Sequence, residues 1–216
     1  MPWQSLGMQH NPLTEPTMPR DAATPVLGVD IGSVAISMAL LDGRGQLQRG
    51  VYAVHHGAIR ETFLTLLGEL GLDEVPYLAR TSSGPETLRA SASYDNHICT
   101  ITAAKRLHEA VGSILLVGGE RFSLIRFDKN GHYADSKSNS SCAAGTGSFL
   151  DQQARNLGFR DSAELSAAAL TAEGEPPKIA SRCAVFAKTD LIHAQQQGYA
   201  RASIANGLCH GLATNI

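Results

Sequence analysis

One pattern occurs twice in this chain and limits what it can fold into: an apolar run, a turn that contains glycine, and a second apolar run. The first copy begins at Val26, where Val-Leu-Gly-Val-Asp-Ile-Gly-Ser leads into Ala-Ile-Ser-Met-Ala-Leu-Leu, and the second begins at Ile114. In both copies an Asp-containing turn follows, at Asp42 and at Asp128, and leads into a further strand-like segment. Apolar runs joined by such turns are typical of antiparallel hairpins. The sequence therefore predicts an antiparallel meander in each half of the chain.

Helical periodicity follows each meander. In the first half, the apolar spacing predicts a covering helix over 57–70 that ends at Gly71, a strand over 76–82 and a second helix over 96–111. In the second half, helices are expected over about 147–157, 161–171, 184–197 and from 201 onward. This order of strands and helices indicates an α/β fold.

The expected organisation is a disordered leader followed by two lobes. Residues 1–24 hold four prolines among polar residues without periodicity, which is typical of disorder. The first lobe is expected over 25–112 and the second over 113–216. Because the sequence stops within an apolar helical pattern without a closing strand, we expect the second lobe to be incomplete and the chain to be the front part of a longer protein.

The composition argues against several classes of partner. Of the 216 residues, 43% are hydrophobic and 18% are charged, and a formal net charge of −2 gives no electrostatic reason to bind nucleic acid or an anionic membrane. No apolar run reaches the roughly 20 residues that a membrane helix needs, and the N-terminus lacks a signal-peptide pattern. We therefore expect a cytoplasmic protein with no nucleic-acid or membrane partner, whose cysteines are free thiols or ligands.

The first glycine turn, Asp30-Ile-Gly-Ser, is a candidate phosphate-binding site. Gly32 has no side chain and tolerates strained dihedral angles, so backbone N–H groups near Gly32 and Ser33 would be able to approach a phosphate. Asp30 would order a nucleotide-bound Mg²⁺ through water. The alternative is an ordinary hairpin turn, because Asp-x-Gly is a short pattern.

The second glycine turn contains Gly118 and Gly119 and occupies the equivalent place in the second half. Two matching turns would face each other across a cleft and bind phosphates from both sides. The second turn lacks an acidic residue at the end of its first strand, however, because Leu116 stands where Asp30 stands in the first. Glu120 is the nearest carboxylate, and Arg121 adds a positive charge.

Two cysteines are candidate metal ligands. Cys142 and Cys183 both lie where a polar stretch turns into a helical pattern, and a helix N-terminus stabilises a thiolate. The small residues Gly145, Thr146 and Gly147 after Cys142 would allow a bulky group close to the backbone, with Thr146 capping the helix or donating to that group. One chain offers two such ligands and two copies offer four, as an iron–sulfur cluster on a twofold axis requires. The alternative is a buried thiol at each position, the reading preferred for Cys99 and Cys209.

These segments resemble the activator, or activase, components of 2-hydroxyacyl-CoA dehydratases and benzoyl-CoA reductases, which are ATPases of the actin and sugar-kinase superfamily. The resemblance runs from about Val26 to the end and is most specific over 139–150 and 182–190. It implies two ribonuclease-H-like lobes. It also implies that Cys142 and Cys183 bind one [4Fe-4S] cluster shared by a homodimer.

The resemblance further implies that Asp30, Gly32 and Ser33 form the first phosphate loop and that Gly118 and Gly119 form the second, with ATP and Mg²⁺ as ligands. In that family ATP hydrolysis drives a conformational change, and an electron passes to a partner dehydratase or reductase.

The sequence departs from the family pattern in three places. Val34 and Ser37 stand where the first loop usually has Thr and Lys, and the second loop lacks its acidic residues. A third Gly-Gly segment, which holds adenosine, does not occur before the sequence stops. We therefore expect weak ATP turnover by this polypeptide alone.

Two other functions remain open on the sequence. A small-molecule kinase of the same superfamily would need a catalytic Asp over a sugar hydroxyl, and the second half offers no suitable candidate. A non-hydrolysing module that keeps the fold and the cluster is favoured by the altered second turn.

Overall fold

The computed structural model describes residues 24–72, 77–139, 146–180 and 183–215. The predicted leader, Cys142 and Gly145 lie outside the described residues. The chain divides into two compact units, one up to Glu109 and the other from Ala110 onward.

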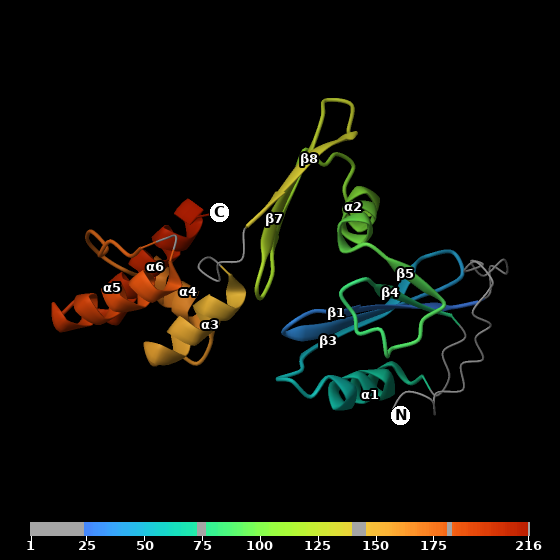
Figure 1. Ribbon diagram of the computed structural model, residues 1–216, viewed down its shortest axis with the longest axis horizontal. Helices are drawn as coiled ribbons and strands as arrows, with labels where there is room; N and C mark the ends of the chain where they lie inside the picture. The colour runs from blue at the N-terminus through green and yellow to red at the C-terminus, as the bar shows by residue number, and fades with distance from the viewer. Residues whose placement is uncertain (1–23, 73–76, 140–145, 181–182, 216) are drawn as a thin grey trace. The chain divides into compact units, whose positions relative to one another are not determined.

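The first unit is built on a mixed five-stranded sheet (Figure 1) with the strand order β3-β2-β1-β4-β5. Strands β1 and β2 pair antiparallel, as do β2 and β3, while β1, β4 and β5 run parallel. Parallel strands bring their carboxyl ends to one edge of the sheet. The strands are β1 (Val26–Ile31), β2 (Ala35–Leu41), β3 (Leu47–Val54), β4 (Leu78–Thr81) and β5 (Ala92–Tyr94).

Helix α1 (Ile59–Leu70) covers one face of this sheet (Figure 1). Its apolar residues recur at helical spacing and are buried against the strands, as with Phe63 and Leu66. Gly71 ends the helix in the left-handed conformation with a φ of 69°. The predicted helix and its glycine stop are therefore confirmed.

Helix α2 (Asn96–Leu107) begins with a side-chain cap and ends earlier than the sequence predicts. Asp95 accepts hydrogen bonds from the backbone N–H groups of His97 and Ile98, at 2.8 and 3.2 Å. His108 is extended, so the helix stops before 111. None of its residues is buried, which explains the error: the apolar spacing did not mark a core face.

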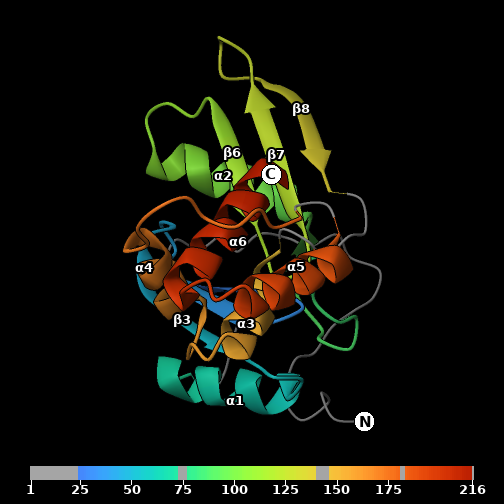
Figure 2. The ribbon, with the colours of Figure 1, turned by 90° about the vertical axis from the view of Figure 1, so that its left-hand side faces the viewer.

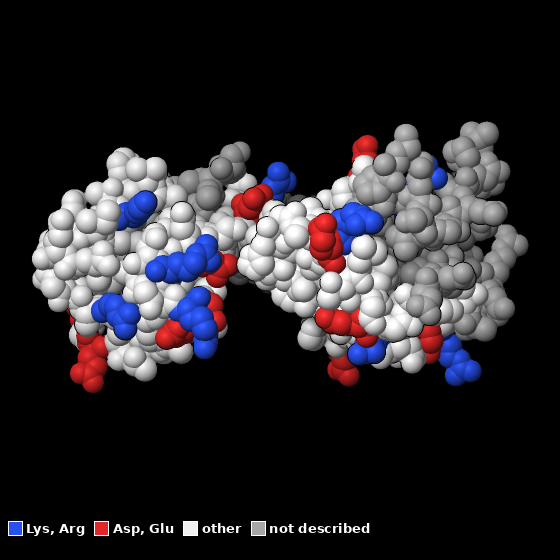
Figure 3. All heavy atoms as spheres, turned by 90° about the horizontal axis from the view of Figure 1, so that it is seen from below, with Lys and Arg blue, Asp and Glu red and all other residues white. Residues whose placement is uncertain are grey.

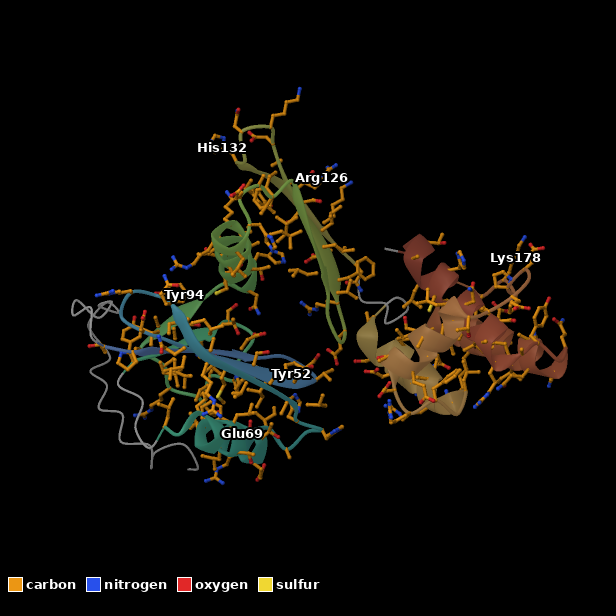
Figure 4. The ribbon with its side chains drawn as sticks, turned by 180° about the vertical axis from the view of Figure 1, so that it is seen from behind. Tyr52, Glu69, Tyr94, Arg126, His132 and Lys178 are labelled. Atoms are coloured by element: carbon orange, nitrogen blue, oxygen red, sulfur yellow. The ribbon has the colours of Figure 1, made fainter. Side chains whose placement is uncertain are left out.

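The second unit starts with an antiparallel sheet of β6 (Ser113–Val117), β7 (Phe122–Phe127) and β8 (Tyr133–Ser138). Figure 4 shows Arg126 on β7 and His132 at the turn between β7 and β8. This turn repeats the turn between β2 and β3. In each, a glycine N–H donates to an Asp carbonyl, Gly45 to Asp42 at 2.9 Å and Gly131 to Asp128 at 3.0 Å.

The rest of the second unit is helical (Figure 2) and forms its own core. The four helices agree with the predicted spans to within about two residues. Buried residues such as Leu165 and Ile204 join α4 to α6. The helices are α3 (Gly147–Asn156), α4 (Ser162–Leu170), α5 (Ala184–Gln196) and α6 (Arg201–Asn215).

On the face drawn in Figure 3, acidic and basic side chains are interspersed. Within the described ranges, none of the helices has the length and apolar character that crossing a membrane requires.

Candidate functional site

The first glycine turn joins β1 to β2 and is closed by a hydrogen bond from the Gly32 N–H to the Ala35 carbonyl, at 2.9 Å. Gly32 does not adopt a positive φ, and a Cβ at this position would lie 3.6 Å from the Ala35 oxygen, an ordinary contact. Gly32 therefore does not use the strained dihedral angles that glycine tolerates, and its place in a phosphate-binding turn stays a prediction. The protein itself leaves room beside Gly32, and Ser33 at the tip is exposed.

The Asp30 carboxylate lies at the end of β1 and is held by neighbouring side chains. Its Oδ1 atom accepts hydrogen bonds from Thr81 Oγ1 at 2.6 Å, Ser83 Oγ at 3.0 Å and Asn96 Nδ2 at 3.4 Å. These donors come from the end of β4, the loop after it and the start of α2. The parallel strands thus converge on Asp30 at their carboxyl edge, the usual location of ligand sites in such sheets.

Asn96 is itself fixed in place. Its Oδ1 atom accepts hydrogen bonds from Ser82 Oγ at 3.0 Å and from the Ser83 N–H at 3.2 Å. Sequence reasoning missed this group of donors. The available signals were the Thr-Ser-Ser-Gly run after a predicted strand and the Asp-Asn pair before a predicted helix.

The second glycine turn joins β6 to β7 and has the same closure, with Gly118 N–H donating to the Arg121 carbonyl at 2.7 Å. The start of α3 packs against it, since the N–H groups of Gly147 and Ser148 donate to the carbonyls of Gly118 and Gly119 at 3.0 and 2.9 Å. Two segments predicted as separate sites are therefore in contact, and two N–H groups of the helix start are used within the protein.

The residues around the start of α3 are tightly packed. A Cβ at Gly147 would lie 3.3 Å from the Gly118 oxygen, closer than most side chains tolerate. Thr146 is the N-cap residue and is fully buried, and its side chain makes no capping hydrogen bond. The expectation that Thr146 caps the helix is therefore wrong, and its alternative role as a donor to a bound group stays a prediction.

Cys183 is the N-cap residue of α5, with the extended φ and ψ of −133° and 119°. Its side chain makes no capping hydrogen bond and no disulfide, and the residue is half-buried. The next turn exposes two large apolar side chains, Val185 at 71% and Phe186 at 65%. A partly accessible thiol with an apolar rim thus lies at the start of a 13-residue helix.

The segment before Cys183 is seated closely on α6. A Cβ at Gly207 would lie 2.2 Å from the Pro177 oxygen, and one at Gly211 would lie 2.9 Å from the Ile179 oxygen, so no larger residue fits at either position. Asp190 of α5 accepts a hydrogen bond from the Ala180 N–H at 2.8 Å. Asp190 is therefore a structural acceptor that joins α5 to the segment before Cys183.

The two remaining described cysteines have a different character. Burial raises the pKa of the Cys99 thiol, and the charges of Asp30 and Asp95 raise it further. Burial also raises the pKa of Cys209. Both are half-buried rather than fully buried, and both favour the neutral thiol. In the part of the chain that the structure describes, no three His, Cys, Asp or Glu side chains group as metal ligands would.

The described chain is a mixed α/β protein with two sheets, and it shares its fold with solved activator structures of the actin and sugar-kinase type. The model of the BadF/BadG/BcrA/BcrD ATPase family matches residues 27–216, and the chain belongs to this family. The fold class predicted from sequence is confirmed.

Two relatives and one solved structure illustrate the similarity. A component of the benzoyl-CoA reductase of Thauera aromatica is 30% identical over 209 residues, covering 89% of this chain and 71% of that protein. The (R)-2-hydroxyglutaryl-CoA dehydratase activating ATPase of Acidaminococcus fermentans is 27% identical over 201 residues, covering 88% and 75%. The activator of the 2-hydroxyisocaproyl-CoA dehydratase from Clostridium difficile with bound ADPNP has a TM-score of 0.76 at 22% identity, covering 88% and 73%, and shares the fold.

Proposed function

We propose that this chain is the nucleotide-binding and cluster-binding part of an acyl-CoA dehydratase or reductase activator. In this proposal it binds ATP with Mg²⁺ at the glycine turns, binds one [4Fe-4S] cluster together with a second copy of itself, and passes an electron to a partner enzyme. The observation that carries the proposal is the half-buried Cys183 thiol at the start of α5, beside exposed Val185 and Phe186.

The nucleotide part is supported by the first turn. The room beside Gly32 and the exposed Ser33 suit the approach of a phosphate. Only the Oδ1 atom of Asp30 is engaged by Thr81, Ser83 and Asn96 in the bonds described above, which leaves Oδ2 to accept from a Mg²⁺-bound water. These residues fit a nucleotide with its metal ion.

The cluster part is supported by the chemistry of the cysteines. A [4Fe-4S] cluster is bound by four thiolates, and once bound it can accept and donate one electron. Cys183 fits as a ligand because it is partly accessible at the start of α5, whereas burial raises the pKa of the Cys99 and Cys209 thiols and favours their neutral form. Cys142 is the remaining cysteine, so four ligands require two copies of the chain.

The partner is proposed from the relatives. Those named above are a component of a reductase of benzoyl-CoA and an activator of a hydroxyacyl-CoA dehydratase. We propose that an acyl-CoA dehydratase or reductase accepts the electron. We also propose that the exposed Val185 and Phe186 of α5 lie in the interface between the two copies of this chain.

Anaerobic purification followed by iron and sulfide analysis and electron paramagnetic resonance tests the proposal. About four irons for two chains are expected in the wild type. Cys183→Ser and Cys142→Ser should lose them, and Cys99→Ser, the matched control, should keep them. A wild type without iron after reconstitution, or iron that persists in Cys183→Ser, would contradict the proposal.

A second candidate is a module of the same fold that keeps the cluster and hydrolyses no ATP. It is favoured by Leu116, which takes the place in the second turn that Asp30 takes in the first. An ATPase assay of the iron-loaded protein separates the two. Turnover that rises with Mg²⁺ supports the first candidate, and bound cluster without turnover supports the second.

A further inference from the structure

His55 is a buried polar side chain behind the first glycine turn. It follows the last residue of β3 and is 6% exposed. A buried imidazole needs hydrogen-bond partners. Its Nε2 atom lies 3.2 Å from the Gly32 carbonyl oxygen, and its Nδ1 atom accepts a hydrogen bond from the Gly57 N–H at 2.9 Å.

The two partners assign the position of the imidazole proton. The Gly57 N–H is only a donor, so Nδ1 must carry a lone pair. The Gly32 carbonyl is only an acceptor, so Nε2 must carry the proton and donate it. A neutral imidazole protonated at Nε2 satisfies both contacts at once.

The backbone beside His55 is shaped to keep these contacts. The His55 N–H donates to the Val34 carbonyl at 3.0 Å, so one residue binds the turn through both its backbone and its side chain. His56 and Gly57 both have a positive φ, of 47° and 87°, which brings the Gly57 N–H back to the ring. His56 is the only described non-glycine residue with this conformation.

The contact with Gly32 determines where the next N–H group points. The Gly32 carbonyl and the Ser33 N–H belong to one peptide plane, and the described peptides are all trans. In a trans peptide these two groups point in opposite directions. Since the Gly32 oxygen points toward the buried His55, the Ser33 N–H points away from His55, and Ser33 itself is exposed.

We propose that His55 is a positioning residue of the nucleotide site, which holds the Gly32–Ser33 peptide so that its N–H group faces a nucleotide phosphate. This inference rests on the proposed nucleotide-binding function. It assigns to His55 no contact with the nucleotide and no part in proton transfer. The ligand chemistry is that of a phosphate oxygen accepting a backbone N–H.

Two amide substitutions separate the two ring contacts. In His55→Gln the side-chain N–H₂ group takes the place of Nε2 and can still donate to Gly32. In His55→Asn the shorter side chain can accept from Gly57 but cannot reach Gly32. His55→Leu removes both contacts, and His56→Asn is the matched control, because asparagine tolerates the positive φ and His56 is exposed.

The test measures, for the full chain, the dissociation constant of Mg²⁺ with a non-hydrolysable ATP analogue, together with the thermal midpoint. His55→Asn and His55→Leu should bind the analogue about tenfold more weakly, and His55→Gln should stay within about threefold of the wild type, as expected for one hydrogen bond. His56→Asn should match the wild type. Because Gln keeps the contact with Gly32 and Asn keeps the contact with Gly57, their comparison decides which contact matters even if His55→Leu does not fold.

The outcomes distinguish this inference from the proposed function. If the wild type binds the analogue and the Gln and Asn variants bind it equally, the positioning role is wrong and the nucleotide site stands. If the affinities follow the thermal midpoints across all variants, His55 acts on stability alone and the inference is also wrong. If the wild type itself binds no analogue, the nucleotide part of the proposed function fails, and the role of His55 fails with it.

Discussion

The two glycine turns share one closing hydrogen bond but are held in place by different contacts. Each is closed by the same N–H to carbonyl bond, Gly32 to Ala35 and Gly118 to Arg121. In the first turn the glycine carbonyl accepts from the side chain of His55, and in the second from the backbone N–H of Gly147.

The strand that leads into each turn carries the other difference. Two positions before the glycine, the first unit has Asp30 with its hydrogen-bonded carboxylate, and the second unit has the apolar Leu116. The two turns thus share their closing hydrogen bond and differ in their side chains, and under the proposed function only the first turn binds a phosphate and its metal ion. The following predictions test this division, beginning with the largest effect.

Removing the charge at the end of β1 should affect nucleotide binding far more than changing its counterpart in β6. For Asp30→Asn we expect a loss on the order of 10–100-fold in affinity for Mg²⁺ with an ATP analogue, as for other groups that orient metal-bound water. Leu116→Asn, the matched control, should leave this affinity within about threefold of the wild type. Titration calorimetry at several Mg²⁺ concentrations provides the measurement. Equal losses in both variants would show that the two turns do not differ as proposed.

Adding one methyl group to each glycine turn should separate effects on nucleotide affinity from effects on the stability of the fold. The Cβ of Gly32→Ala has ordinary room, 3.6 Å from the nearest atom, so the thermal midpoint should not change. The methyl group stands where a phosphate would approach, so nucleotide affinity should fall by about tenfold. In Gly118→Ala the Cβ would lie 3.1 Å from the Arg121 oxygen, so this variant should instead lose about 1 kcal/mol of stability.

Thermal unfolding and nucleotide binding, measured on both alanine variants, check this pair. If Gly32 served only the fold, Gly32→Ala would lose stability and keep its nucleotide affinity. A Gly32→Ala protein with unchanged midpoint and unchanged affinity would mean that no phosphate approaches this turn.

Removing one donor from Asp30 should have a smaller effect. For Asn96→Ala we expect about three- to tenfold weaker binding of the Mg²⁺–nucleotide, because one hydrogen bond to Oδ1 and the anchoring of Ser83 are lost. Ser82→Ala is the control, since Ser82 donates to Asn96 and not to Asp30. The same calorimetric titration applies. If the two variants bind alike, the bond from Asn96 to Asp30 does not orient the carboxylate.

The sequence predicted those parts of the molecule whose signals are local. The helix over 59–70 has an apolar face and a glycine stop within its own few residues, and the two hairpins carry their turn residues with them. Strand β5 was missed because it is three residues long and offers no periodicity to detect.

The site was only half predictable for the same reason. Asp30 and Gly32 could be identified because they belong to one short turn. Thr81, Asn96 and His55 become part of the site only through the pairing of β1 with β4 and of β2 with β3, which brings together residues far apart in the chain. Side chains that act across such pairings leave no spacing pattern in a single sequence.

The hairpin turns at Asp42 and Asp128 test whether the two halves of the chain use the same turn, and the expected effect is the smallest of those predicted. Each carboxylate accepts two backbone N–H groups, from Arg44 and Gln46 in the first unit at 2.9 and 2.8 Å, and from Asn130 and His132 in the second at 2.8 and 2.9 Å. The hydrogen bond from Gln46 lowers the pKa of Asp42, and that from His132 lowers the pKa of Asp128.

A lowered folded-state pKa fixes the sign of the pH dependence. The charged form is favoured in the folded protein, so each turn contributes stability above the pKa of an unfolded Asp, about 3.9, and loses it as the pH falls through the lower folded value. Both carboxyl groups should therefore titrate below about 3.9 when followed by carbon NMR. The Nδ1 atom of His132 lies 3.5 Å from Oδ2 of Asp128, and the charge of His132 lowers the pKa of that carboxyl further, as the charge of Arg44 does for Asp42. Replacing His132 by Asn, which keeps the backbone donor, should raise the pKa of Asp128 and leave that of Asp42 unchanged, and an unchanged pKa of Asp128 would show that the His132 side chain does not contribute to it.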